Sequence, residues 1–146
     1  IGGSFFGNTK GTDPFITSLQ EESKQIADSI VFTGFIPYEQ IPSYLAMCDV
    51  AVIPSMWEDP FHTTVLEAMA AGLPIIATNS GGITEACKDC AIIINRNSNI
   101  VDNLHNSILK LYRNVEMSKK MTDCCVKQSL KFNKGEYAIS FFNSLQ

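Results

Sequence analysis

The sequence predicts an α/β fold in which a parallel sheet is flanked by helices and followed by a helical C-terminal tail. Two short apolar runs, residues 50–54 and 73–77, are separated by a segment with helical character, which is the order strand, loop, helix, strand. A further apolar run occupies residues 91–94, and only helical patterns follow Asn95. Repeated strand–helix units favour parallel strands joined by right-handed crossovers.

Length and net charge limit the number of domains and the kinds of binding partner to be expected. The 146 residues have the size of one domain, and their 45% hydrophobic content is enough for a core. We therefore expect one compact unit, residues 1–146. The net charge is −4 and no basic run occurs, which argues against a nucleic-acid partner. An anionic ligand would then be held mainly by backbone amides and helix ends.

The cysteines and the apolar runs predict a cytosolic location. An odd number of cysteines, irregularly spaced among helices and strands, suits a reducing compartment and thiols better than a disulfide framework or a metal site. No apolar run approaches the roughly 20 residues that a membrane span needs, and no signal-peptide pattern is present. The five cysteines are Cys48, Cys87, Cys90, Cys124 and Cys125.

The N-terminal third should contain two helices around one strand. The sequence begins without an initiator methionine, as expected of a fragment cut inside or just before a strand. Pro14 suits the first turn of a helix, where its missing amide does no harm, and Gly34 ends a β-rich run. The expected elements are a strand-to-helix turn at residues 2–7, a helix from 12 to about 28, a strand at 30–33, a loop at 35–37 and a helix at 38–47.

The remainder should supply three strands and the helices around them. Asp49 introduces an apolar run that Pro54 ends, Gly72 suits the end of a helix of small residues, and Gly81 opens a turn. The expected strands are residues 50–53, 73–77 and 91–94, and the expected helices are residues 65–71, a short one after Gly82 to about 86, 100–112, 116–130 and 134–145.

Two acidic residues make the loop after residues 50–54 a candidate site. Asp59 in the loop and Glu67 in the following helix have seven residues between them, and the loop falls at the carboxyl edge of a parallel sheet, where ligands usually bind. Ionised carboxylates are strong acceptors, so one acid suits a sugar and the other a ribose, while helix-start amides at residues 63–65 suit a diphosphate. The plainer alternative is a capping acid and a solvated helix glutamate, with Glu58 as a competitor for the first role.

A longer pattern surrounds these two acids. It comprises Pro54-Ser55, Asp59-Pro60-Phe61, the run from Val65 to Pro74, and Gly81-Gly82 with Glu85 beyond it. The pattern closely resembles the nucleotide-sugar-binding half of retaining glycosyltransferases of the group 1 type, which include bacterial lipopolysaccharide and capsule transferases. The likeness covers nearly the whole chain, because it extends to Phe32-Thr33-Gly34, the run from Cys48 to Ser55, and Lys131-Phe132-Asn133.

The resemblance implies a Rossmann-like domain that is half of a two-domain GT-B architecture. It implies that an acceptor-binding domain precedes this chain, and that the intact protein transfers a sugar from a nucleotide-diphosphate donor to an acceptor hydroxyl with retention of configuration. No metal or other cofactor is expected. The family suggests a role in cell-surface polysaccharide or lipopolysaccharide synthesis, in the cytoplasm or peripherally at the inner face of the membrane. A fragment without the acceptor domain is expected to bind nucleotide weakly and to be inactive.

The resemblance also implies roles for the two acids. Glu67 matches the second acid of the family's Glu-x7-Glu motif, which binds the ribose of the donor. Asp59 matches the first acid, which contacts the transferred sugar beside the reacting carbon, because Asp59 and not Glu58 keeps the spacing and precedes Pro-Phe. Aspartate is one methylene shorter than the family's glutamate. That difference leaves open a direct contact with the sugar, a shifted loop, or a changed choice of donor.

Further donor contacts follow from the same resemblance. His62 stands where many members have glycine, and it either narrows the pocket, adds a hydrogen-bond donor, or is a partly exposed loop histidine. Trp57 is read as a core or loop anchor rather than a stacking platform, and the same reading competes with donor contact for Phe61. The expected donor-binding residues are Phe35 and Ile36 at the base, then Phe61, His62, Thr63, Thr64, Val65 and Glu67.

Two rival functions stay open. One is a non-catalytic nucleotide-binding module, to which the aspartate and histidine departures lend support. The other is a nucleotide-sugar epimerase, which shares the two-domain architecture but matches residues 59–72 less well. The base, the sugar and the acceptor are not identified by the sequence.

Overall fold

The computed structural model describes residues 14–133 and residue 135. The chain divides into two compact units, Ile1–Ile41 and Pro42–Gln146, where the sequence analysis expects one. Each unit is described by itself below. The expected turn at residues 2–7 lies outside the described part, and so does the expected helix at 134–145 apart from residue 135.

The described part of the first unit begins with a helix. Helix α1 spans Pro14–Glu22 and is followed by a 3₁₀ helix, Ser23–Ser29. The expected continuous helix to residue 28 is therefore wrong in its second half. Ile26 has φ −127° and ψ 25°, which are not helical values, so the backbone kinks there.

The expected strand at residues 30–33 is also wrong. No strand is assigned to these residues, and only Gly34 forms an isolated bridge. A β-rich run becomes a strand when a neighbouring strand pairs with it and the sheet covers one of its faces. Val31 is 73% exposed and Ile30 and Phe32 are only half-buried, so none of the apolar residues of this run is fully buried.

The helix expected at residues 38–47 is confirmed in kind and is shorter. It consists of a 3₁₀ helix, Tyr38–Gln40, and helix α2, Ile41–Leu45. The Pro37 carbonyl accepts a hydrogen bond from the Gln40 amide at 2.9 Å, which closes the 3₁₀ turn.

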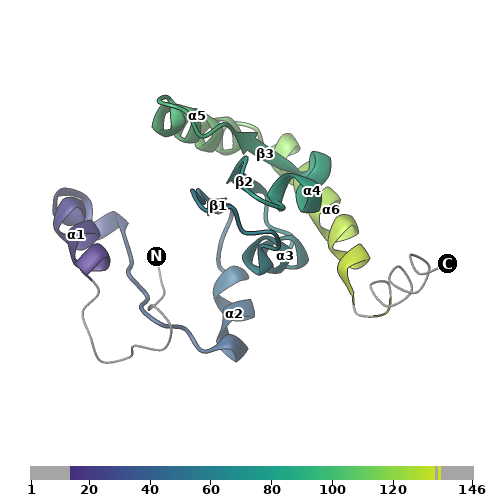
Figure 1. Cartoon of the computed structure of the whole chain (residues 1–146), viewed down its shortest axis with the longest axis horizontal. Coiled ribbons are helices and arrows are strands. Elements are labelled where there is room, and N and C mark those ends of the chain that lie inside the picture. Colours follow the sequence, from purple (N-terminus) through teal and green to yellow (C-terminus); the bar gives the residue numbers. More distant parts are fainter. Residues whose placement is uncertain (1–13, 134, 136–146) are drawn as a thin grey trace. The chain divides into compact units, whose positions relative to one another are not determined.

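The second unit is built on a parallel sheet, as the sequence predicts. Strands β1 (Ala51–Ile53), β2 (Ile75–Thr78) and β3 (Ala91–Ile94) pair in that order, and both pairs are parallel (Figure 1). Helix α3 (Thr63–Ala70) joins β1 to β2, and helix α4 (Ile83–Cys87) with the 3₁₀ helix Lys88–Cys90 joins β2 to β3. The loops that follow the three strands therefore meet at one edge of the sheet.

Side-chain alternation along β2 creates two core clusters. Ile75 and Ala77 belong to a cluster with residues of α3, α4 and α6, while Ile76 belongs to a second cluster with residues of α5 and α6. Successive residues of a strand face opposite sides of a sheet, so the clusters lie on opposite faces. Figure 1 shows α3 and α5 on opposite sides of the strands. All four residues of β2 are buried. A strand that is covered on both faces has a nearly continuous apolar sequence, which explains the apolar run that predicted it.

Helices α5 and α6 complete the second unit. Helix α5 spans Ile100–Tyr112, as expected, and helix α6 spans Val115–Ser129 before a 3₁₀ helix, Leu130–Phe132. The Asn114 side chain accepts a hydrogen bond from the Met117 amide at 2.9 Å and caps α6, which is why the helix begins one residue earlier than predicted. Helix α6 packs against both α3 and α5.

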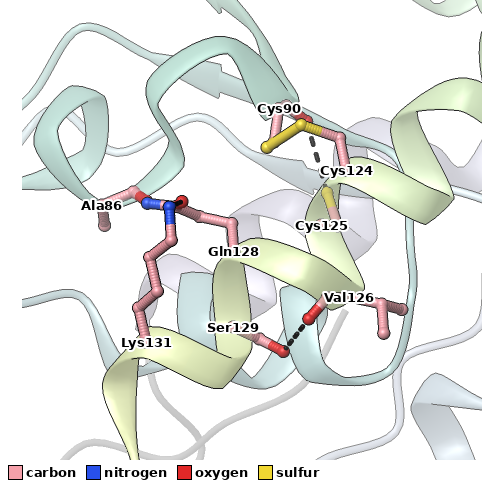
Figure 2. The surroundings of a disulfide bond; sticks show 8 residues. All are labelled: Ala86, Cys90, Cys124, Cys125, Val126, Gln128, Ser129 and Lys131. Atoms are coloured by element: carbon pink, nitrogen blue, oxygen red, sulfur yellow. Dashed lines mark hydrogen bonds between the residues drawn. A yellow bond between two sulfur atoms is a disulfide. The ribbon is translucent and has the colours of Figure 1, made fainter. Parts of the chain in front are cut away.

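A disulfide fastens α6 to the sheet. Cys90, just before β3, is bonded to Cys124 of α6 across a sequence separation of 34 residues (Figure 2). The expectation of thiols is wrong for this pair, because the fold brings their Cα atoms within 5.3 Å, a distance that suits a disulfide. The thiols of Cys87 and Cys125 stay unpaired and buried, and burial raises their pKa to about 12 and about 11.

The end of α6 is also tied to α4 by hydrogen bonds. The Gln128 side chain donates to the Ala86 carbonyl at 3.0 Å and accepts from the Lys131 ammonium at 2.8 Å, and Figure 2 shows Gln128 between these two residues. Because α6 also packs on α3, it supports both helices that start near the carboxyl edge of the sheet.

Candidate functional site

The loop between β1 and α3, residues 54–62, carries Glu58 and Asp59, and side chains at and just after the end of β2 hold its backbone. The Thr78 hydroxyl donates to the Ser55 carbonyl at 2.5 Å, and the Ser80 hydroxyl donates to the Trp57 carbonyl. Both hydroxyl residues are almost completely buried, with 0% and 1% exposure. Because a buried hydroxyl needs a partner, these bonds fix the course of the loop.

Two glycines bring the turn before α4 into direct contact with the same loop. The Gly82 amide donates to the Asp59 carbonyl at 3.0 Å, and the Gly81 amide donates to the Glu58 carboxylate at 2.5 Å. A Cβ at Gly81 would lie 2.0 Å from the Asp59 carbonyl oxygen, and one at Gly82 would lie 2.2 Å from the Pro60 carbonyl oxygen. Only glycine fits where two backbones approach this closely.

A third loop contributes Arg96, which follows β3. Its guanidinium forms an ion pair with Glu58 and donates to the Met56 carbonyl at 3.1 Å. The hydrogen bond from the Gly81 amide, and then the bond from Arg96, lower the pKa of Glu58 below its ordinary value of 4.5. Glu58 therefore acts as an anchor that ties the loops after all three strands together.

Arg96 was not among the site residues predicted from the sequence. The available signal was its place directly beyond an apolar strand, at the edge where Glu58 and Asp59 were expected. Parallel strands bring such positions together even when they are far apart in sequence. Glu58, weighed as a competitor of Asp59, is engaged with the Gly81 amide and the Arg96 guanidinium.

The Asp59 carboxylate is half exposed and partly engaged by its own loop. Its Oδ1 accepts a hydrogen bond from the Phe61 amide at 2.9 Å, an Asx-type turn that fixes the side chain over the loop. Its Oδ2 lies 3.9 Å from Nδ1 of His62, and 47% of the Asp59 side chain is exposed. The free lone pairs of this carboxylate are therefore available to a ligand.

The first two residues of α3 are exposed. His62 is the N-cap residue, with φ −73° and ψ 94° and no side-chain cap bond, and Thr63 and Thr64 are exposed. Val65 is buried, and its amide donates to the His62 carbonyl at 3.1 Å. The candidate phosphate-binding amides are thus those of Thr63 and Thr64, while Glu67 is half-buried one turn further along.

The structure brings most of the predicted residues into one segment. Asp59, Phe61, His62, Thr63, Thr64, Val65 and Glu67 all lie in the loop or on α3. Trp57 and Phe61 are 81% and 56% exposed, so the Trp57 backbone anchors the loop while both rings face outward. Phe35 and Ile36 belong to the first unit, and Phe35 is 59% exposed.

A pocket of about 320 Å³ borders the same loop. It contains neither Asp59 nor Glu67, and its walls come from the loop, α4 and the end of α6. The lining residues are Pro60, Phe61, Gly82, Glu85, Ala86, Lys88, Gln128, Lys131 and Phe132. Within the described residues, no three or more His, Cys, Asp or Glu side chains gather to hold a metal ion, and no helix there has the length and apolarity to span a membrane.

The family model that matches this chain and two of its related sequences describe glycosyltransferases. Residues 2–124 match the family model described as "Glycosyl transferases group 1". YtcC of Bacillus subtilis (strain 168), itself a predicted glycosyltransferase, is 34% identical over 122 residues, which are 83% of this chain and 30% of that protein. The GDP-mannose-dependent α-(1-6)-phosphatidylinositol monomannoside mannosyltransferase of Mycolicibacterium smegmatis is 33% identical over 87 residues, which are 54% of this chain and 23% of that protein. The chain thus spans less than a third of these relatives.

Solved structures share the fold. HepE of Anabaena, determined in complex with UDP and with UDP-glucose, superposes with a TM-score of 0.78 at 20% identity, covering 99% of this chain and 40% of HepE. The sucrose-phosphate synthase of Thermosynechococcus elongatus superposes with a TM-score of 0.76 at 23% identity, covering 92% of this chain and 36% of that enzyme.

Proposed function

The chain belongs to the group 1 glycosyl transferases, and on that basis we propose that residues 1–146 form the donor-binding domain of an enzyme that transfers a sugar from a nucleoside diphosphate. The observation that carries the proposal is the open start of α3 beside two acids: Thr63 and Thr64 are exposed at the helix start, Asp59 stands before it, and Glu67 one turn inside.

The chemistry of this arrangement matches the parts of a nucleotide sugar. The positive end of a helix dipole and the unpaired amides of its first turn favour a diphosphate. Glu67 is placed to accept both hydroxyls of a ribose, and charged acceptors make the stronger hydrogen bonds. Asp59 then meets the sugar beyond the diphosphate. The UDP and UDP-glucose complexes of HepE support a nucleotide-sugar ligand.

We propose that the whole protein retains the anomeric configuration of the sugar and transfers it to an acceptor hydroxyl. The acceptor-binding domain is proposed to precede this chain, which spans only 30% of YtcC, and the isolated chain is proposed to bind nucleotide without catalysing transfer. The diphosphate leaving group would be stabilised by helix amides and basic side chains rather than by a metal ion.

The acceptor is proposed to belong to cell-surface polysaccharide or lipopolysaccharide synthesis. One relative is named for its action on a phosphatidylinositol monomannoside, which supports an acceptor linked to a lipid. We therefore propose that the whole protein works in the cytoplasm, associated peripherally with the inner face of the membrane.

A second candidate is a non-catalytic nucleotide-binding module. The Asp59 carboxylate is already used by the Phe61 amide, which is the kind of contact that a purely structural acid makes. This candidate keeps nucleotide binding and lacks transfer, so an activity assay separates the two.

The first prediction concerns the two acids in the whole protein. Glu67→Ala should weaken donor binding about 100-fold, because two charge-assisted hydrogen bonds are lost. Asp59→Ala should lower kcat about 100-fold while leaving UDP affinity nearly unchanged, because Asp59 meets only the sugar. Calorimetry with UDP and a product assay with a panel of UDP-, GDP- and ADP-sugars measure these quantities.

Asp102→Ala serves as the matched control. Asp102 is an exposed acid in the first turn of α5, so this variant has the same change in charge as the two test variants. It should bind UDP and transfer sugar like the wild type. Wild-type transfer by both Asp59→Ala and Glu67→Ala would refute the site, and nucleotide binding without transfer of any sugar would favour the binding module.

A further inference from the structure

The His62 side chain is an unusual feature of the loop because it is buried beside an exposed acid. Only 10% of this side chain is exposed, against 47% for Asp59, and its Nδ1 lies 3.9 Å from Asp59 Oδ2. His62 makes no cap bond to the amides of α3. A polar ring that is buried and does not cap the adjacent helix lowers the stability of the fold unless it makes another favourable interaction.

The second nitrogen of the ring decides which tautomer the neutral imidazole adopts. Nε2 is buried and has no hydrogen-bond partner within the described part of the chain. A proton on Nε2 would bury an unsatisfied donor and would also point the Nδ1 lone pair at a carboxylate oxygen. A proton on Nδ1 leaves only a lone pair unsatisfied and faces an N–H toward Asp59. Both considerations favour protonation of the neutral ring on Nδ1.

Both oxygens of Asp59 then face a donor. Oδ1 accepts from the Phe61 amide at 2.9 Å, and Oδ2 faces the His62 Nδ1–H at 3.9 Å. The second contact is longer than a hydrogen bond and acts as an orienting electrostatic contact, of a kind that tightens when substrate fills a site. With one oxygen hydrogen-bonded to the Phe61 amide and the other near the His62 ring, the carboxylate has one preferred orientation.

We propose that His62 is a positioning residue that holds the Asp59 carboxylate in the orientation in which it meets the sugar of the donor. This inference rests on the proposed function for its catalytic consequence. The proposal explains together the two departures from the family pattern, Asp59 in place of glutamate and His62 in place of glycine. The shorter acid is accompanied by a ring that orients it. The pair is expected to influence which sugar is accepted, because the hydroxyl that Asp59 reaches depends on its orientation.

The orientation itself is tested without any substrate. Long-range proton–nitrogen NMR spectra of the 146-residue chain, recorded where both rings are neutral, report which imidazole nitrogen carries the proton. The chain has only two histidines, and exposed His105 of α5 is the internal reference, assigned with His105→Gln. His62 should be protonated on Nδ1 in the wild type and should shift toward Nε2 in Asp59→Asn, while His105 is unchanged.

The catalytic consequence is tested in the whole protein with two matched amides. His62→Asn places its amide donor where Nδ1 stands, and His62→Gln places it near the position of Nε2. The asparagine variant should keep kcat within about threefold, and the glutamine variant should lose about tenfold in kcat with the donor KM nearly unchanged. UDP affinity should be the same in both.

Distinct results overturn the two proposals. A His62 ring protonated on Nε2, or a tautomer that Asp59→Asn leaves unchanged, would overturn the positioning role whatever the activity shows. Equal kcat values for the asparagine and glutamine variants would overturn it as well. Failure of the proposed function would appear instead as a wild-type protein that binds no nucleotide, while the tautomer measurement would still decide whether His62 orients Asp59.

Discussion

Replacing Gly81 with alanine is expected to destabilise the second unit by about 4 kcal/mol, from overpacking and from the left-handed backbone. The new Cβ would lie 2.0, 2.7 and 2.9 Å from the oxygen, carbon and nitrogen of the Asp59 backbone, and Gly81 has φ +46°. Backbone atoms cannot step aside as a side-chain tip can, so the loop at residues 54–62 must move. Urea unfolding at equilibrium measures the loss as a lower midpoint with an unchanged slope.

Gly34→Ala separates the steric part of this effect from the conformational part. Gly34 has a similar φ of +65°, but no atom of the described residues lies within 4 Å of its added Cβ. Its substitution should cost only about 1 kcal/mol. Equal losses for Gly81→Ala and Gly34→Ala would contradict the close approach of the Gly81 turn to Asp59.

Removal of the disulfide between Cys90 and Cys124 should cost about 4 kcal/mol, because a bond that closes a loop of this length restricts the unfolded chain. The sequence separation of the two cysteines is 34 residues. The double variant Cys90→Ser/Cys124→Ser should unfold at a lower urea concentration than the wild type in the absence of reductant. Dithiothreitol should lower the stability of the wild type and leave the double variant unchanged.

Cys48→Ser is the control for this prediction, since Cys48 is an exposed free cysteine. Its stability should equal that of the wild type with and without reductant. A wild-type chain whose unfolding midpoint ignores dithiothreitol, although mass spectrometry finds the disulfide formed beforehand, would contradict the stabilising role of the bond. The raised pKa values of the buried Cys87 and Cys125 thiols keep them protonated and slow to exchange with it.

The elements that could be predicted are those in which a short stretch of sequence shows which side chains are buried. β3 and α5 have the bounds expected from the sequence, because an apolar run between breakers and a single apolar stripe are both short-range signals. The run at residues 30–33 has the same local character, but Val31 is 73% exposed and no strand forms. Whether a β-rich run becomes a strand depends on neighbours that a local pattern does not reveal.

Contacts between distant residues were the part that could not be predicted. Cys90 and Cys124 are 34 residues apart, and Glu58 and Arg96 are 38 apart. Either pair could have had many other partners by sequence alone, and the three-dimensional path of α6 and β3 selects these. The odd number of cysteines even pointed away from a disulfide.

The candidate site was predictable to the extent that it is contiguous. Asp59 lies in the loop and Glu67 on the helix that follows it, so their spacing in the sequence largely sets their relative positions in the structure. The support of that loop by Ser80, Gly81 and Arg96 comes from two other strand ends and is not visible in the motif. The buried ring of His62 likewise became apparent only from its surroundings.

The central claim is that a nucleoside diphosphate binds at the start of α3, and its most direct test is an NMR titration of the 146-residue chain with UDP. The account predicts saturable shifts of the Thr63 and Thr64 amides, together with Glu67, and loss of these shifts in Glu67→Ala under the same conditions. Saturable shifts confined to other parts of the chain, such as the contact between α5 and α6, would contradict the account, as would no shifts at all at millimolar UDP.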